Sequence, residues 1–384
     1  MPRPLAPSRC LILVSVALAA LGVAGCSSPL SKLPSERTVE PTASLIAAHD
    51  QIENHTELYT TSREGEQDVR VAIHRLGPGD STTKLVFLHG VFADSESWRY
   101  VAGQLATDHD LWLVDSPGCG DSDVPHPSTL RPDGYSPGAM ADRILQALAG
   151  KLRDEPAGTR LVLVAHSLGG AVAIHMLADP ELEEAHAGTV GRIDRAVLLA
   201  PLDFAQHKAD ADIRTLATID GLALSAGAAT GYIQRQCRLM TEQGFADQRY
   251  AVREEAEKRF EILSDPARRR ALQAQLLQAV AFDEDFLPQW EQIDRQTELY
   301  RRVRVPTLIV WGAWDEVLPV AKGYMFRALM PDSELVVVPA LKHSAHLERP
   351  VWTAGAIESF LDGRVVAAPP ARETQSLVTG DAEP

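Results

Sequence analysis

The sequence is poor in cysteine, in aromatic residues and in positive charge. Its 384 residues include 4 Cys, aromatic residues make up 6% of the chain, and 37 Lys and Arg stand against 52 Asp and Glu, for a formal net charge of −15. Because no cluster of basic residues is present, we expect no binding to nucleic acid. The cysteines and histidines lack the paired spacing of zinc sites, and the chain has no internal repeats.

Apolar residues are plentiful by contrast. They make up 45% of the chain, and charged residues make up 23%. A chain of this length and composition can build one large α/β domain or two modest ones. Alanine is common, which favours helices.

The first 25 residues have the pattern of an export signal. Arg3 and Arg9 precede the apolar run LILVSVALAALGVAG, which is short for a membrane span. The run ends in small residues followed by Cys26, and this resembles the lipobox of bacterial lipoproteins. The resemblance implies a signal peptide over 1–25, a lipid attached to Cys26 and an exported, membrane-anchored protein. An ordinary signal peptide or an uncleaved anchor is the alternative.

The residues after Cys26 refine this interpretation. Ser27 and Ser28 stand where an Asp would resemble an inner-membrane retention signal, so an outer membrane, on its periplasmic side, is favoured. Loss of the signal peptide removes two Arg and leaves a net charge of −17. With Cys26 lipidated, Cys119 and Cys237 remain. A disulfide between them is possible outside the cytoplasm, and two free thiols are the state that we favour.

Strand-like and helix-like segments alternate along most of the chain. The expected strands are 57–62, 69–77, 85–90, 111–118, 161–167, 196–201, 307–312 and 334–339, and the expected helices include 137–151, 169–179 and 352–361. This order predicts an α/β fold with a mainly parallel central sheet and helices on both faces.

One interval breaks the alternation and defines the domains. Residues 205–301 contain helical patterns and no good strand, which predicts a helical cap over the carboxyl edge of the sheet. The core then comprises 51–204 and 302–365. Residues 26–50 are expected to be a tether, and 366–384 a disordered tail.

The stretch LVLVAHSLGG places one hydroxyl between a strand and a helix. Ser167 occupies the middle of Ala165-His166-Ser167-Leu168-Gly169, which is the G-x-S-x-G pattern of a nucleophile elbow with Ala in the first place. Such a turn exposes the serine oxygen at the carboxyl edge of the sheet. The helix that follows points its first N–H groups at the same place, which favours developing negative charge.

An acyl-transfer reaction also needs two backbone donors for the oxyanion. The amide of Leu168, directly after the nucleophile, is one candidate. The amide of Val91, directly after the strand end LVFLHG, is the other. We interpret His89 in that strand end as a structural residue that supports the loop.

Two further strand ends carry the remaining catalytic groups. TLIVWGAWDEVLP ends in Asp315, a carboxylate that can orient a histidine, and Asp203 after the strand AVLLAP is the alternative. After the last strand come His343 and His346, of which His343 is the expected base and His346 the alternative. The order Ser…Asp…His along the chain is the one expected of this fold.

Taken together, VFLHG, DSPGCGDSD, AHSLGG, WGAWDEVLP and KHSAHLERP resemble the α/β-hydrolase superfamily, in its cap-bearing branch, over about residues 55–365. In that family the first His of the last motif is catalytic, which maps onto His343, and Glu348 follows at the family's spacing. Lys342 replaces the usual Gly, and Cys119 takes a place often held by an aromatic residue. By the same resemblance, Asp115 and Ser122 shape a loop near the pocket.

The resemblance implies a serine hydrolase that cleaves a carboxylic ester of a small molecule through an acyl-enzyme and needs no metal or cofactor. Dehalogenases and epoxide hydrolases of the superfamily use Asp where this chain has Ser167. Acyl transfer to another acceptor, C–C bond hydrolysis on the same triad, or a non-catalytic lipid-anchored binding protein are the alternatives. Leu222, Leu224, Tyr232, Phe245, Phe282, Phe286 and Trp290 in the cap either line the pocket or simply pack.

Overall fold

The computed structural model of the chain describes residues 28–35, 52, 55–204, 206, 211–283 and 285–370. The expected signal peptide, Cys26, most of the expected tether and residues 371–384 lie outside these ranges. Within the described ranges, no helix combines the length and the apolar character needed to cross a bilayer.

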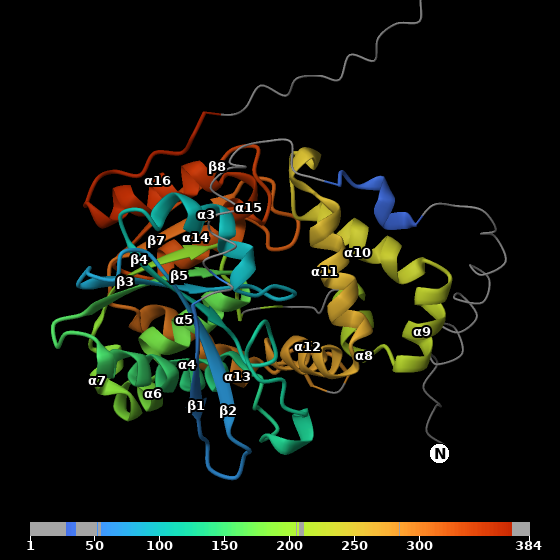
Figure 1. Ribbon diagram of the computed structural model, residues 1–384, viewed down its shortest axis with the longest axis horizontal. Helices are drawn as coiled ribbons and strands as arrows, with labels where there is room; N and C mark the ends of the chain where they lie inside the picture. Colours follow the sequence, from blue (N-terminus) through green and yellow to red (C-terminus); the bar gives the residue numbers. More distant parts are fainter. Residues whose placement is uncertain are drawn as a thin grey trace, which may run out of the picture.

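The described chain is built around one sheet of eight strands (Figure 1). The strands are β1 (Thr56–Thr61), β2 (Val69–Leu76), β3 (Thr83–Leu88), β4 (Asp110–Asp115), β5 (Arg160–His166), β6 (Ile193–Leu199), β7 (Thr307–Gly312) and β8 (Ser333–Val338). Their order across the sheet is β1-β2-β4-β3-β5-β6-β7-β8. From β4 to β8 all neighbours are parallel, and only the β1–β2 and β2–β4 pairs are antiparallel. The expected mainly parallel sheet is confirmed.

Helices cover the sheet on both faces and extend beyond its carboxyl edge. The α-helices are α3 (Arg99–Leu105), α4 (Pro137–Lys151), α5 (Leu168–Ala178), α6 (Pro180–Ala185), α7 (Ala187–Val190), α8 (Ala211–Thr218), α9 (Gly221–Ala229), α10 (Tyr232–Gln243), α11 (Arg253–Ser264), α12 (Pro266–Gln278), α13 (Trp290–Arg302), α14 (Ala321–Leu329), α15 (Ala345–Glu348) and α16 (Pro350–Leu361). The 3₁₀ helices are η2 (Pro29–Lys32), η3 (Ser95–Trp98), η4 (Pro127–Thr129), η5 (Leu152–Asp154) and η6 (Gln248–Tyr250).

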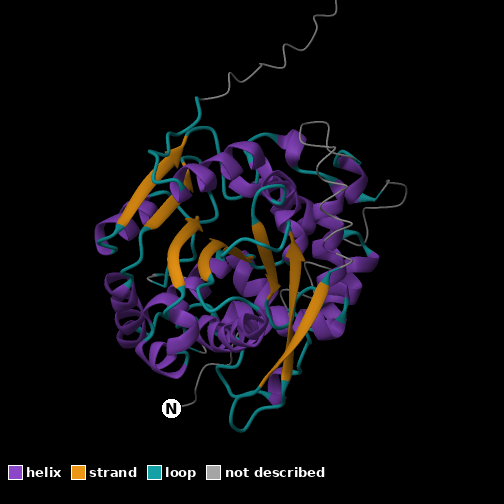
Figure 2. Cartoon of the chain, turned by 60° about the vertical axis from the view of Figure 1, so that its left-hand side comes forward, coloured by secondary structure: helices purple, strands orange, loops and turns teal. Residues whose placement is uncertain are grey.

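The central strands are apolar on both sides, and this is why they need two helical layers. Every residue of β4 and β7 is buried. One apolar cluster joins the sheet to α4, α5, α13 and α14, and a second joins its other face to α3 and α16. Figure 2 shows the strands at the centre of this shell of helices.

The helical insertion after β6 forms its own apolar cluster. Residues of α8 to α12 pack there with three residues of the core, Phe92, Tyr100 and Leu347. The last helix of the interval assigned to the cap behaves differently, because α13 packs on α5 and its Leu299 and Tyr300 belong to the core cluster under the sheet. The described cap therefore ends before α13.

Packing also extends beyond the expected domain limits near both ends of the described chain. Leu30 and Leu33, within the stretch assigned to a tether, are buried in the cap cluster. At the other end Val366 is buried in the cluster that includes α3 and α16. The Trp352 indole also donates a hydrogen bond to the Ala367 carbonyl (3.1 Å). Packing thus continues slightly beyond residue 365.

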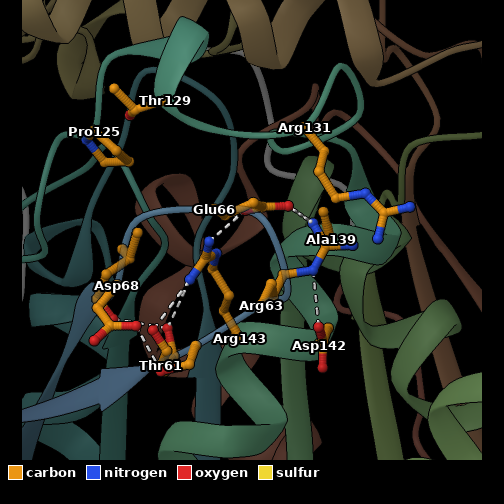
Figure 3. A network of polar contacts seen from close by, with 12 residues as sticks. Thr61, Arg63, Glu66, Asp68, Pro125, Thr129, Arg131, Ala139, Asp142 and Arg143 are labelled. Atoms are coloured by element: carbon orange, nitrogen blue, oxygen red, sulfur yellow. Dashed lines mark hydrogen bonds and ion pairs between the residues drawn. The ribbon is translucent and has the colours of Figure 1, made fainter.

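A buried ionic network fastens the β1–β2 hairpin to α4 (Figure 3). The Arg143 guanidinium donates to the Glu66 carboxylate and to the Thr61 carbonyl, and the side chains of Arg143 and Glu66 are fully buried. Arg63 bridges Glu66 to Asp142 on α4. The hairpin contributes the two strands at one end of the sheet, so this network holds that end in place.

Replacing Glu66 by Ala should lower the free energy of unfolding by about 3–5 kcal/mol, because it leaves the Arg143 charge buried without its partner. The matched control is Glu64→Ala, in the same turn but exposed, which should change it by less than about 0.5 kcal/mol. Urea unfolding of the two variants measures the difference. Equal stabilities would contradict the role assigned to the network.

Candidate active site

Ser167 sits in a strained turn between β5 and α5. Its backbone has φ +50° and ψ −117°, outside the regions that a non-glycine residue normally adopts. Its N–H donates to the Leu199 carbonyl (3.1 Å), and its carbonyl accepts from the N–H groups of Gly170 (2.9 Å) and Leu202 (2.8 Å). Hydrogen bonds to the neighbouring β6 segment therefore hold the strained conformation.

Glycines make this turn possible because other backbone lies against them. A Cβ on Gly169 would lie 2.5 Å from the carbonyl oxygens of Leu88 and His89, and one on Gly170 would lie 2.5 Å from the Pro201 side chain. The first helical turn of α5 therefore packs directly on the ends of β3 and β6. This explains the two glycines after Ser167-Leu168.

The two amides assigned to the oxyanion belong to the start of α5 and to the loop after β3. Leu168 is the first residue of α5, where helix geometry leaves the N–H without a partner in the helix. Val91 follows Gly90, whose Cβ, if present, would lie 3.2 Å from the Ser167 Cβ. Among the residues that the structure describes, neither amide donates a hydrogen bond, so both are available to a ligand.

Asp315 and His343 come together at the ends of β7 and β8. The His343 Nδ1 lies 2.8 Å from an Asp315 carboxylate oxygen, and both residues are buried. The other carboxylate oxygen accepts the N–H groups of Val317 and Leu318, both at 2.9 Å. The carboxylate is thus fixed in place by its own turn, and it orients the histidine with Nε2 free of this contact.

The alternative carboxylate, Asp203, is engaged elsewhere. It is fully buried, accepts the Tyr300 hydroxyl at 2.9 Å and pairs with Lys322. Burial and the charge of Asp203 hold the pKa of Tyr300 well above its ordinary value, which keeps that hydroxyl a donor. Asp203 therefore joins α13 and α14 to the end of β6, and Asp315 is the carboxylate that meets His343.

Three histidine rings, those of His166, His343 and His346, lie in contact with one another in tilted arrangements. The ring of His166 lies 4.8 Å from that of His343 and 4.3 Å from that of His346, and His346 also lies 4.6 Å from Trp98. The His166 Nε2 is 3.2 Å from the His343 carbonyl oxygen, so the residue before Ser167 contacts the loop of the expected base. No pattern in the sequence predicts this contact.

Burial makes the two inner histidines neutral. It lowers the pKa of His346 to about 3, and it holds the pKa of His166 well below the ordinary value, helped by the proximity of His346 and His343. The Nδ1 of His346 is buried and makes no hydrogen bond within the described chain. Among the described residues, no carboxylate forms a hydrogen bond with His346, whereas Asp315 contacts His343.

His89 supports the loop after β3, as expected from the sequence. Its Nδ1 lies 2.8 Å from the Gly90 carbonyl oxygen, and its Nε2 accepts the Ser116 N–H at 3.0 Å. The first contact lies within the loop after β3, and the second connects that loop to the one after β4.

Asp115 and Ser122 shape the loop after β4. The Ser122 hydroxyl donates to the Asp115 carbonyl (2.6 Å) and accepts the Ala72 N–H (2.8 Å). The Asp115 carboxylate accepts from the N–H of Ser95 (2.7 Å) and from His74 (2.9 Å). Burial raises the pKa of Asp115, but the hydrogen bond and charge of His74 outweigh it and keep the pKa below its usual value.

One group in the described chain has the composition of a metal site. His74, Asp115 and Asp121 bring their ligand atoms within 4.8 Å of one another, beside a cleft of about 390 Å³. However, His74 and Asp115 form a hydrogen bond with each other, and the Asp115 carboxylate also accepts the Asp121 N–H at 2.8 Å. Hydrogen bonds within the protein therefore account for this cluster.

The loop of His343 is held from two sides. Lys342, which departs from the family pattern, pairs with Glu316 at 2.9 Å and so ties the loop to the one that carries Asp315. A Cβ on Gly312 would lie 2.1 Å from the Lys342 carbonyl oxygen, which shows how closely the loop passes the end of β7. Lys342 therefore adds an outer contact without displacing the histidine.

Glu348 connects this loop to the cap. Its carboxylate accepts the N–H groups of Ala246 and Asp247, both at 3.0 Å. Burial raises the pKa of Glu348, although the two amides oppose the shift. The Glu of the last motif thus anchors the segment between α10 and α11.

Further ion pairs join the cap to the core near η3. The Arg99 guanidinium lies 2.8 Å from the Glu255 carboxylate on α11, and Lys258 pairs with Asp94. Burial raises the pKa of Glu255, but the charges of Arg99 and Arg259 outweigh it and lower the pKa to about 2.

The apolar residues suggested for the pocket fall into different environments. Leu224 and Phe245 are buried in the cap cluster, whereas Leu222, Tyr232 and Trp290 are exposed. Phe282 and Phe286 are half-buried, and the Phe286 ring lies beneath Arg214. Phe245 shares its cluster with Phe92 of the oxyanion loop, so packing explains it.

Cys119 and Cys237 are both free thiols, as favoured from the sequence. Burial raises the pKa of Cys119 to about 12 and that of Cys237 to about 11. Both are therefore protonated and poor nucleophiles at neutral pH.

Replacing Glu255 by Gln should lower the free energy of unfolding at pH 7 by about 3–5 kcal/mol, because Arg99 loses its buried partner. The folded-state pKa of Glu255, about 2, lies below the usual 4.5, so its stabilisation is present above pH 4.5 and is lost as the pH falls towards 2. The wild type should therefore lose more stability than the variant between pH 7 and pH 3 in urea titrations.

The control for this prediction is Glu261→Gln, an exposed residue of the same helix, which should follow the wild type at both pH values. A constant difference between the wild type and Glu255→Gln at the two pH values would contradict the assigned pairing.

Comparison with known proteins places these observations in context. The chain is 23% identical over 320 residues to the dihydrolipoyllysine-residue acetyltransferase component of the acetoin cleaving system of Cupriavidus necator, an alignment that covers 78% of this chain and 72% of the relative.

Solved structures share the fold. An esterase from a Rhodococcus species superposes with a TM-score of 0.59 at 21% identity and covers 81% of this chain and 99% of its own. A meta-cleavage product hydrolase from Pseudomonas fluorescens superposes with a TM-score of 0.57 at 19% identity, with 77% and 95% covered. The model of the alpha/beta hydrolase family matches residues 85–356, from β3 into α16. The chain therefore belongs to the alpha/beta hydrolase family.

Proposed function

We propose that the protein hydrolyses carboxylic esters of small molecules through Ser167, His343 and Asp315. The observation that carries the proposal is the 2.8 Å contact between Asp315 and the His343 Nδ1, made at the sheet edge where the turn at Ser167 also lies. A buried carboxylate that fixes one ring nitrogen leaves the other to act as a base.

Each group then has one role. The Ser167 oxygen attacks the acyl carbon and passes its proton to the His343 Nε2, which donates it to the leaving alcohol. The amides of Val91 and Leu168 stabilise the oxyanion of each tetrahedral intermediate. Water, deprotonated by His343, then releases the acid. Because Asp315 is held by two amides of its own turn, the histidine ring keeps its orientation through both steps.

An ester is the substrate class that asks least of these groups, since its alcohol leaves more readily than an amine or a carbon. Acyl transfer to another acceptor and C–C bond hydrolysis use the same triad. Product analysis with added alcohols distinguishes acyl transfer from hydrolysis, because a transferase forms a new ester and a hydrolase forms the acid.

Replacing Ser167 by Ala should lower the rate of short-chain ester hydrolysis by at least about 1000-fold and should abolish labelling by a fluorophosphonate, because the nucleophile is lost. Hydrolysis of a chromogenic ester and in-gel labelling measure the two effects. The matched control is Ser116→Ala, at a buried serine just after β4. This variant should retain both ester hydrolysis and fluorophosphonate labelling. A wild-type protein that is inert on a broad acyl panel and unlabelled would leave the non-catalytic alternative.

We also propose that the protein is exported and anchored by lipid on Cys26, on the periplasmic side of an outer membrane. The support is the lipobox-like run before Cys26. Several acyl chains, each worth about 0.8 kcal/mol per buried CH₂, would hold the protein firmly on a bilayer.

Replacing Cys26 by Ser should move the protein from the membrane fraction to the soluble fraction or stall its processing, since the acylated thiol is missing. Fractionation and intact-mass measurement report the two outcomes. Cys119→Ser, which removes a thiol of the folded domain, should leave both unchanged. Membrane partition and processing that survive the change at Cys26 would contradict the lipid anchor.

A further inference from the structure

The first described segment of the chain lies on the cap and not on the core. The 3₁₀ helix η2 packs against α10 and α11, with Leu30 and Leu33 only 6% and 5% exposed. The Arg253 N–H donates a hydrogen bond to the Pro34 carbonyl at 2.9 Å, which fixes the end of the segment at the start of α11. Two buried leucines and a backbone hydrogen bond make this a specific docking contact.

The docked segment begins very close to the proposed lipid attachment site. Three residue steps separate Cys26 from Pro29, and a fully extended chain spans about 10 Å over that number. Pro29 in turn lies against the α9–α10 turn, because a Cβ on Gly231 would be 3.3 Å from the Pro29 ring. With Cys26 at the level of the lipid headgroups, that turn is held within about 10 Å of them.

The same part of the cap exposes apolar side chains. Leu222 on α9 is 77% exposed, and Tyr232, next to Gly231 at the start of α10, is 37% exposed. Helix α10 lies beside η2 and α9 packs on α10 at the same end of the molecule, whereas α6 and α7 lie at the opposite end (Figure 1). Leu222, in particular, is far more exposed than a leucine of a packed helix.

We propose that the cap surface formed by η2, α9 and α10 is the face that meets the phospholipid bilayer. This inference rests on the proposed anchor at Cys26. The docked segment makes the anchor short and attaches it to the cap, so the cap faces the membrane and α6 and α7 point away from it. Leu222 and Tyr232 are the side chains that contact the lipid.

The docking of η2 determines how the domain is oriented on the membrane, because the chain between Cys26 and the core is long. From Cys26 to Ile52, which is buried in the core, an extended chain reaches roughly 90 Å. Were η2 not docked, a domain on such a chain would have no fixed orientation on the membrane. The buried leucines are therefore the residues that set the orientation.

The test uses the full-length, membrane-bound protein with a photo-crosslinking benzoylphenylalanine in place of Leu222, of Tyr232 or, as the control, of Glu184 on α6. After irradiation in phospholipid vesicles, we expect mass spectrometry to find lipid adducts at positions 222 and 232 and none at 184. Adducts at all three positions, or at none, would overturn the proposal.

A second set of variants separates docking from anchoring. Leu30→Asp with Leu33→Asp should keep the protein on the membrane but should lose the lipid adducts at 222 and 232. Ser31→Asp is the matched control, because it places the same charge on the exposed side of η2. Thermal unfolding confirms that the variants are folded, and adducts that persist in the double variant would overturn the proposal.

The two underlying proposals fail differently. A mature protein without acyl groups on Cys26 would overturn the membrane face together with the anchor. If the protein proves not to hydrolyse esters, the lipid crosslinks should still form, because they depend on Cys26 and η2. The variant Ser167→Ala, which alters neither, should therefore give the same crosslinks as the wild type.

Discussion

At Ser167 the chain leaves β5 and enters α5 with a backbone conformation that only close packing can maintain. Carbonyls at the end of β3 lie against Gly169, Pro201 lies against Gly170, and Leu199 and Leu202 bond the backbone of Ser167. The ends of three neighbouring strands therefore meet at this turn. The loop after β3 lies against this turn at Gly90, and His166, just before the turn, contacts His343.

Of the three neighbouring histidines, His343 alone contacts a carboxylate within the described chain. His166 and His346 are buried and uncharged, so they add bulk and ring contacts without adding positive charge near the site. Two glutamates connect the core to the cap. Glu348 accepts hydrogen bonds from the segment between α10 and α11, and Glu255 on α11 pairs with Arg99. These contacts join the segment after His343 and the start of α3 to the cap.

Local sequence signals were sufficient for the sheet and its edge. The expected span 307–312 for β7 and 137–151 for α4 agree with the structure, because continuous apolar runs and a Pro start mark them clearly. The choice of Asp315 over Asp203 needed the structure, since both follow strands and only Tyr300 and Lys322, distant in sequence, distinguish them. The burial of Leu30 and Leu33 also depends on partners about 200 residues away, so a short run of Pro, Ser and Leu carried no sign of it.

The central claim is the convergence of Ser167, His343 and two backbone amides on one acyl carbon. A crystal structure of the protein after reaction with a fluorophosphonate tests it most directly. The account predicts phosphorus bonded to the Ser167 oxygen, with the phosphoryl oxygen about 2.7–3.1 Å from the amide nitrogens of Val91 and Leu168. Phosphorus on any other residue, or a phosphoryl oxygen turned away from both amides, would contradict it.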